Sequence, residues 1–157
     1  MIQRIQTIYL FLAALCSLIL CFTILGTSYA PANPDTPAAI VKAFTTTMGG
    51  QAVETSLPQW MPGLFLVLAT LLRLIAICGY KNRKNQARTC RSAIIADLCA
   101  ATLTCLQVYN LGKLLPGSTA HPSPTLAMLL ISIVFTLLAI RAIRHDERLV
   151  RAADRLR

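Results

Sequence analysis

Two charged side chains interrupt long apolar stretches of this sequence, and they are its first candidates for chemistry. Arg73 and Asp97 each have apolar neighbours on both sides. Charges in apolar helices are costly, usually face the interior of a helix bundle and often mark ion or proton sites. Both residues are twelve positions from Asn85, so an antiparallel helix pair joined there would hold them at similar depth. We predict that they form an ion pair joining these helices. The alternative is a proton or ion site, which usually uses several acidic or His side chains.

A second polar group lies near the end of the third apolar stretch. Gln107 and Asn110 are three positions apart, so on a helix they share a face. We predict that they form interhelical hydrogen bonds, with a pore lining as the alternative. No metal and no cofactor are expected, because His121 is alone in its segment and the six cysteines contain no C-x-x-C pair.

Four apolar stretches carry these residues, over residues 5–25, 61–79, 93–115 and 124–143. Hydrophobic residues make up 55% of the chain and charged residues 13%, against about 25% charged in soluble domains. A helix of about 20 apolar residues crosses the hydrocarbon core of a bilayer. The sequence therefore predicts an all-α integral membrane protein, in which residues 1–157 form a single domain built on a four-helix transmembrane bundle.

The first apolar stretch has a second interpretation. Ser28-Tyr29-Ala30 has the small-x-small form of a cleavage site, which would make residues 1–30 a secretory signal peptide. However, the stretch is longer than the ~7–15 apolar residues of a usual signal peptide, and a single Arg precedes it. An uncleaved span is therefore favoured.

The positive charges predict the orientation of the chain. Twelve Lys and Arg lie at the N-terminus, in the loop 81–91 and in the segment 141–157, whereas the two opposite loops carry Lys42 and Lys113. Loops rich in Lys and Arg stay in the cytoplasm. Both termini and the loop 81–91 are therefore predicted to be cytoplasmic.

The connecting segments have their own patterns. Residues 26–59 contain Gly49-Gly50 between two β-prone runs, residues 40–48 and 51–55. A Gly-Gly pair between such runs is typical of a β-hairpin, and we predict a small one on the extracytoplasmic side. Residues 116–124 are expected to form a short loop. Residues 144–157 contain no Gly or Pro and are expected to continue the last helix into the cytoplasm.

The cytoplasmic charges also predict contacts with other molecules. A single-stranded nucleic-acid site would alternate aromatic and basic residues, and Tyr80 is the only aromatic residue near these charges, so no nucleic acid is expected. Clusters of Lys and Arg beside a membrane helix attract anionic lipids of the inner leaflet. Three apolar positions of the tail share one helical face, which is suited to lipid or to a partner, either a membrane protein or a second copy of the chain. The predicted contacts are Lys81, Arg83, Lys84, Arg88, Arg91, Arg148, Leu149, Arg151, Ala153, Arg155 and Leu156.

Three segments are similar to those of a known family. They are the opening Met1-Ile2-Gln3-Arg4-Ile5-Gln6-Thr7-Ile8-Tyr9-Leu10, the segment Gly79-Tyr80-Lys81-Asn82-Arg83, and the run Arg141-Ala142-Ile143-Arg144-His145-Asp146-Glu147 near the end. The sequence resembles a family of small bacterial four-span membrane proteins catalogued as a domain of unknown function, number 4293. The resemblance covers essentially the whole chain and implies a four-span protein of the bacterial inner membrane. It assigns no catalytic residues.

No motif in the sequence names a reaction. A membrane aspartyl peptidase needs two intramembrane Asp residues, and this chain has one. A quinone-linked disulfide oxidase needs outward-facing cysteine pairs, and a small multidrug exporter needs an acid in its first span; the sequence has neither. We therefore expect a non-enzymatic accessory or scaffold protein, with a small oligomeric transporter or channel subunit as the alternative.

Overall fold

The computed structural model describes residues 2–30, 33–52, 57–79, 83–114 and 117–155. Within these ranges the helices are α1 (Ile2–Leu20), α2 (Met61–Cys78), α3 (Arg83–Leu114) and α4 (Ala127–Arg155), and the short 3₁₀ helix η1 (Pro124–Leu126) leads into α4. The strands are β1 (Ile24–Ala30), β2 (Asn33–Lys42), β3 (Thr46–Met48), β4 (Gln51–Ala52) and β5 (Thr119–Pro122).

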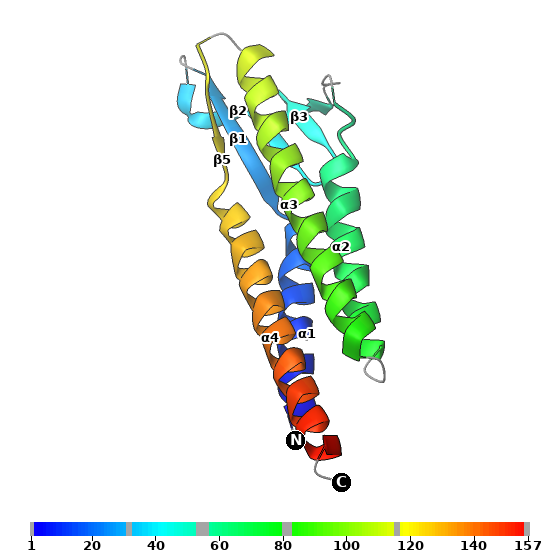
Figure 1. Cartoon of the computed structure of the whole chain (residues 1–157). Helices are drawn as coiled ribbons and strands as arrows, with labels where there is room; N and C mark the ends of the chain where they lie inside the picture. Colours follow the sequence, from blue (N-terminus) through cyan, green and yellow to red (C-terminus); the bar gives the residue numbers. More distant parts are fainter. Residues whose placement is uncertain (1, 31–32, 53–56, 80–82, 115–116, 156–157) are drawn as a thin grey trace.

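The helices run side by side along the long axis of the molecule (Figure 1). α1 packs against α2 and α4, and α3 packs against the same two helices. Both termini lie at one end, together with the end of α2 and the start of α3, whereas the strands lie at the other end (Figure 1). The molecule therefore has a helical body with a sheet at the end opposite its termini.

The strands form one antiparallel sheet in the order β4-β3-β2-β1-β5. β1 pairs with β2 on one side, and on the other side with β5, where Thr27 lies opposite His121. The sheet packs on the last turns of α3, where Val108 and Leu111 form a buried cluster with Val41. The chain is mostly helical, as predicted, but a five-stranded sheet stands where the all-α prediction allowed one small hairpin. The segment expected as a loop before α4 supplies β5, because its backbone pairs with β1.

The predicted glycine turn is present between β3 and β4. Gly49 and Gly50 have φ values of 57° and 86°, which glycine adopts without strain and which a two-residue hairpin turn requires. The predicted strand bounds were wrong, because residues 40–42 belong to β2 and the chain turns back over residues 43–45 before β3 begins. The hairpin is one edge of the larger sheet, and this sheet supplies the support that an isolated hairpin lacks.

α1 ends five residues before the predicted end of the first stretch, at Leu20 instead of Leu25. Ile24 and Leu25 begin β1 instead. The backbone N–H of Ser123 donates to the carbonyl oxygen of Leu25 at 2.9 Å, and the hydroxyl of Thr125 donates to the carbonyl oxygen of Ile24. Bonds from the segment before α4 thus replace the helical bonds that these carbonyls would otherwise make.

α3 begins at Arg83, ten residues before the predicted start of the third stretch, so most of the expected basic loop is helical. Lys and Arg are good helix formers, and no Gly or Pro occurs between Arg83 and Leu111. The 32 residues of α3 extend about 48 Å. At the sheet end α3 therefore reaches beyond α2 and carries the sheet (Figure 1). α4 continues without a break to Arg155, which confirms the predicted helix over residues 144–155; residues 156 and 157 lie outside the described residues.

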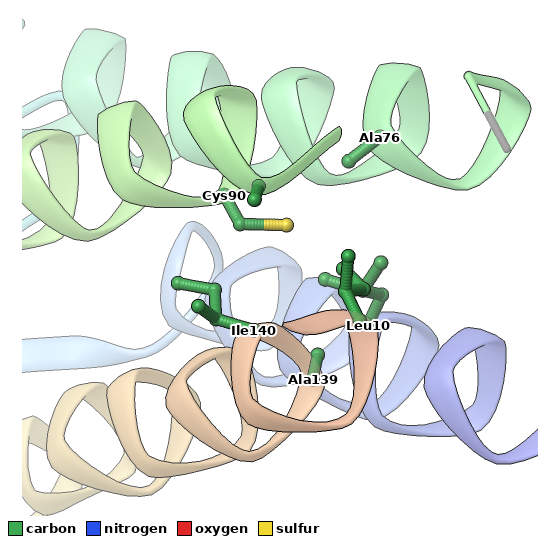
Figure 2. Close-up of a cluster of buried hydrophobic side chains, with 7 residues drawn as sticks. Leu10, Ala76, Cys90, Ala139 and Ile140 are labelled. Carbon is green, nitrogen blue, oxygen red and sulfur yellow. The ribbon is translucent and has the colours of Figure 1, made fainter. Parts of the chain in front are cut away.

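Small side chains allow the helices to approach closely near the termini. Leu10 from α1, Ala76 from α2, Cys90 from α3, and Ala139 and Ile140 from α4 point toward one another in a buried cluster (Figure 2). Alanines at helix contacts shorten the distance between backbones and favour packing without bulky side chains.

The outward faces of the helices are apolar. Phe11 on α1, Leu71 on α2, Ile95 on α3 and Leu130 on α4 are each at least half exposed. Among the described helices, α2, α3 and α4 are long and apolar enough to cross a membrane, and the apolar part of α1, Ile5–Leu20, is shorter. Polar side chains of the same helices are buried in the interior.

Candidate functional site

Arg73 of α2 and Asp97 of α3 face each other in the interior of the helical body. Both side chains are completely buried, with 0% of their surface exposed. Nη2 of Arg73 donates to Oδ2 of Asp97 within a salt bridge, and Nη1 donates to Oδ1 at 3.4 Å. The structure therefore brings together the two charges that the sequence places in separate apolar stretches.

Three hydroxyl groups from α1 and α4 complete this site. Ser132 donates to Oδ2 of Asp97 at 2.9 Å. Nη1 of Arg73 donates to the hydroxyl of Ser17 at 2.6 Å, and its Nε donates to the hydroxyl of Thr136 at 3.1 Å. We call these five residues (Ser17, Arg73, Asp97, Ser132 and Thr136) the polar centre. Every one of the four helices contributes at least one side chain to it.

Two of the hydroxyls are oriented by their own helices. Ser17 donates to the carbonyl oxygen of Ala13 at 2.9 Å, and Thr136 donates to that of Ser132 at 2.8 Å. A hydroxyl has one donor hydrogen and two acceptor lone pairs. Because the hydrogen is used one turn back along the helix, the lone pairs are available to the guanidinium group of Arg73.

The polar centre balances its charges and satisfies them with hydrogen bonds. The carboxylate of Asp97 accepts bonds from Arg73 and Ser132, and a guanidinium group stays charged in proteins. A buried charge is tolerated when it is paired and hydrogen-bonded. None of the five side chains has exposed surface. Such an arrangement joins and orients four helices. Among the described residues, no three His, Cys, Asp or Glu side chains gather as a metal site would require.

Gln107 and Asn110 lie nearer the sheet, in the last part of α3. Nε2 of Gln107 donates to the carbonyl oxygens of Pro58 and Gln59 at 3.3 and 3.4 Å, and the Gln107 side chain is 1% exposed. Asn110 is half-buried almost one turn further along. Gln107 thus joins α3 to the chain that precedes α2, and it is not part of the polar centre.

A second buried polar contact joins α1 to α4 near the termini, and it was not predicted from the sequence. Nε2 of Gln6 donates to Oδ2 of Asp146, and the two residues are 6% and 7% exposed. The hydroxyls of the polar centre were not predicted either. Helical spacing could have indicated these contacts. Asp146 is three residues from Ile143, and Thr136 is seven residues before Ile143, so the three side chains share one face of α4.

Four of the predicted lipid or partner contacts have described side chains, and these lie at the end with the termini. Arg88 and Arg91 are exposed on the first turns of α3, and Arg148 and Leu149 are exposed on α4. These two helix segments lie at the same end of the molecule (Figure 1). The other predicted contacts fall outside the described side chains: Arg83 and Lys84 in α3, Arg151, Ala153 and Arg155 in α4, and Lys81 and Leu156 outside the described residues.

Comparison with known proteins places these features in a family. Among curated proteins, none matches the chain. The model of one protein family, described as a domain of unknown function (DUF4293), matches residues 2–156. This range includes the polar centre, the contact between Gln6 and Asp146, and all five strands. The chain therefore belongs to the DUF4293 family.

Proposed function

We propose that this protein spans the inner membrane of a bacterium four times and acts there as a non-enzymatic accessory or scaffold protein. The support for the spans is the distribution of side chains, because each helix turns apolar side chains outward and buries polar ones. Large apolar surfaces are rarely exposed to water, whereas intramembrane charges normally face the bundle interior. The four helices would thus form a transmembrane bundle around the polar centre.

α1 supplies the fourth span although its helix is short. Its 19 residues extend about 28 Å, close to the ~30 Å of the hydrocarbon core. Ile24 and Leu25 continue the apolar run as a strand, and their carbonyls accept hydrogen bonds from Thr125 and Ser123. Non-helical backbone is tolerated at such a depth where protein groups satisfy it.

The proposed orientation follows the positive charges. Exposed Arg88 and Arg91 at the start of α3 lie at the end with both termini, and so do the arginines of α4, whereas Lys113 ends α3 at the end with the sheet (Figure 1). Ends rich in Lys and Arg stay in the cytoplasm. Both termini are then cytoplasmic, and the sheet lies on the opposite side of the membrane.

Site-directed labelling tests this orientation. Single cysteines at Lys84, Arg157, Pro37 and Ser118, in a chain without its native cysteines, are treated with a maleimide that cannot cross membranes. We expect labelling at 37 and 118 in intact cells, and at 84 and 157 only after the membrane is opened. A C-terminus labelled in intact cells contradicts the four-span topology. A mature chain that begins at Pro31 would show that residues 1–30 are a signal peptide.

The closed polar centre is the observation that carries the accessory role. A transport site must bind its cargo and release it, so its groups open to water at some stage. The polar centre has its charges paired internally and has no exposed surface. Gln107 is ten residues from Asp97, or about 15 Å along the helix, and it faces the chain before α2. The two therefore do not form a continuous polar path, and a rigid scaffold is the better interpretation.

The last part of α4 is the surface proposed for a partner. Leu149 and Val150 are 49% and 45% exposed, and Arg148 beside them is exposed as well. An amphipathic helix of this kind binds either a membrane surface or the groove of a partner. The proposed partner is a membrane protein or a second copy of the chain, with anionic lipids around it.

Removal of residues 149–157 tests the partner role. A chain that ends at Arg148 keeps the contact between Gln6 and Asp146, whereas a chain that ends at Ile143 would lose Asp146. The full and shortened chains are purified from native membranes in mild detergent, and the co-purifying proteins are identified by mass. We expect the shortened chain to lose its partner while its helicity and thermal unfolding stay unchanged. Retention of the same partner contradicts the proposed surface.

Proteoliposomes test the transport alternative. Vesicles that contain the protein and a pH-sensitive dye report proton movement across the bilayer. We expect no proton flux above that of empty vesicles. A flux that persists in the chain ending at Arg148 but disappears in Asp97→Asn would replace the scaffold interpretation with transport through the polar centre.

A further inference from the structure

A groove of about 770 Å³ lies between the outer sides of α1 and α4, toward the termini. α1 contributes Ile5 and Tyr9 to its wall, and α4 contributes the remaining lining residues. The ring of Tyr9 stacks on that of Phe135, with 6.3 Å between the ring centroids. This contact holds Tyr9 against α4 and gives the groove an apolar wall.

The α4 side of the groove changes from apolar to cationic along the helix. Leu137, Arg141, Arg144 and Arg148 all line the groove. The successive spacings from Leu137 to Arg148 are four, three and four residues, so the four side chains form one row on the helix surface. From Arg141 to Arg148 the row extends about 10 Å. In the proposed orientation the apolar end points into the membrane and the cationic end points to the cytoplasm.

The three guanidinium groups of this row form no salt bridge with a described residue. The described lining of the groove contains no carboxylate either. Asp146, which lies on the same stretch of α4, accepts from Gln6 between the helices. The groove therefore presents three positive charges to an external anion.

We propose that this groove binds an anionic phospholipid with two phosphates, of the cardiolipin type, from the cytoplasmic leaflet. The inference rests on the membrane embedding and orientation proposed above and adds a ligand to them. Acyl chains would lie along Leu137 and Tyr9, and the phosphates would meet the arginines. One phosphate is within reach of Arg141 and Arg144, which are less than one turn apart. Arg148 lies one turn further, where it suits a second phosphate. Arg is well matched to phosphate geometry, and basic pockets between membrane helices bind such headgroups.

Lipid binding to the purified full-length chain tests the proposal. The delipidated protein in detergent is titrated with cardiolipin, phosphatidylglycerol or phosphatidylcholine, and bound lipid is measured by native mass spectrometry. We expect cardiolipin to bind most tightly and phosphatidylcholine least. Combined Arg141→Gln and Arg144→Gln should weaken cardiolipin binding about 30-fold, which corresponds to about 1 kcal/mol for each Arg. The matched control, combined Lys42→Gln and Lys113→Gln, removes the same charge from exposed side chains at the end with the sheet and should leave the affinity within about threefold.

A change of shape without a change of charge provides a second test. Ala142 lines the groove, and Ala142→Trp would fill it. We expect this variant to lose cardiolipin binding while its helicity stays that of the original chain. Equal affinity for cardiolipin and phosphatidylcholine, equal losses in the two double variants, or unchanged binding by Ala142→Trp would each overturn the proposal. Lipid binding in detergent does not depend on membrane topology. A negative result in the cysteine-labelling test would therefore contradict the proposed orientation without contradicting the lipid site.

Discussion

The Arg73–Asp97 pair gives the sharpest test of what holds the four helices together. Asp97→Asn keeps the size of the side chain and one acceptor oxygen but removes the negative charge. Arg73 then stays charged and fully buried, with only the hydroxyls of Ser17 and Thr136 as further partners. We therefore expect Asp97→Asn to destabilise the helical body.

The size of the expected loss in unfolding free energy depends on where the ion pair lies along α2. Removal of one partner of a buried ion pair commonly costs about 3–5 kcal/mol. Arg73 is five residues from the end of α2 at Cys78, or about 7.5 Å. In the proposed membrane its long side chain can bend toward the interface and recover part of the loss. We expect a loss of about 3 kcal/mol, at the lower end of that range.

Removal of both charges should change the free energy of unfolding less than removal of one. Combined Arg73→Met and Asp97→Leu leaves no buried charge, and such replacements are often neutral or stabilising by about 1–4 kcal/mol. Exchange of the two charges, Arg73→Asp with Asp97→Arg, should restore part of the stability, because hydroxyls can both donate and accept. Ser132→Ala is the matched control. It removes one hydrogen bond to Asp97 without changing charge and should cost about 1.5–3 kcal/mol.

Reversible unfolding in mixed micelles measures these differences. The purified variants are titrated with a denaturing detergent, and helicity is followed by circular dichroism. Arg73→Met and Asp97→Leu are also measured alone, and a loss in their combination equal to the sum of the two single losses would show that Arg73 and Asp97 are not coupled. That result would refute the role of the polar centre in joining the four helices.

Two further predictions concern contacts outside the polar centre. A Cβ at Gly63 would lie 2.7 Å from the carbonyl oxygen of Ala43. Gly63→Ala should therefore lower the free energy of unfolding by about 1–3 kcal/mol, measured as a lower thermal unfolding temperature. Gly112→Ala is the control, because its nearest neighbour is a side-chain Cβ at 3.2 Å, and an equal loss would contradict the reasoning. Gln6→Leu removes a hydrogen bond to the Asp146 carboxylate and should cost about 1.5–3 kcal/mol in the same unfolding measurement; an unchanged midpoint would contradict it.

Much of the helical part of the structure could be predicted from local sequence. α2 and α4 occupy apolar stretches of the expected length, and α4 continues into its charged part because nothing there breaks a helix. The start of α3 was placed too late, since a dense run of positive charge was interpreted as a loop although its residues favour helix. Charge is evidence about the side of the membrane, and it says little about backbone conformation.

Only the part of the sheet that depends on neighbouring residues could be predicted from the sequence. The turn at Gly49-Gly50 depends on two adjacent residues. β1 depends on residues 119–122, about ninety positions away, which supply its second partner strand. Ile24 and Leu25 continue an apolar helix pattern, and only the pairing with distant segments makes them a strand. Single-sequence patterns do not contain that information.

The candidate site was predictable to the extent that its residues are rare. Two charges in apolar helices are conspicuous, and their spacing around Asn85 indicates that they lie opposite each other. Ser and Thr are ordinary residues in apolar helices, so Ser17, Ser132 and Thr136 do not stand out. Their role depends on which faces of α1 and α4 turn toward Arg73, and tertiary packing decides that.

The contact between the first and last helices has a consequence for how the protein is made. Gln6 and Asp146 are 140 residues apart, and ribosomes add about 5–20 residues per second, so α1 waits roughly 7–28 s for α4. Arg73 and Asp97 can pair as soon as α3 is complete, whereas Ser132 and Thr136 are synthesised afterwards. If the chain is inserted into a membrane as proposed, the order of synthesis implies an intermediate in which α2 and α3 are already joined. In the proposed membrane topology, a chain stalled before α4 would expose the polar side of α1 to lipid until α4 covers it.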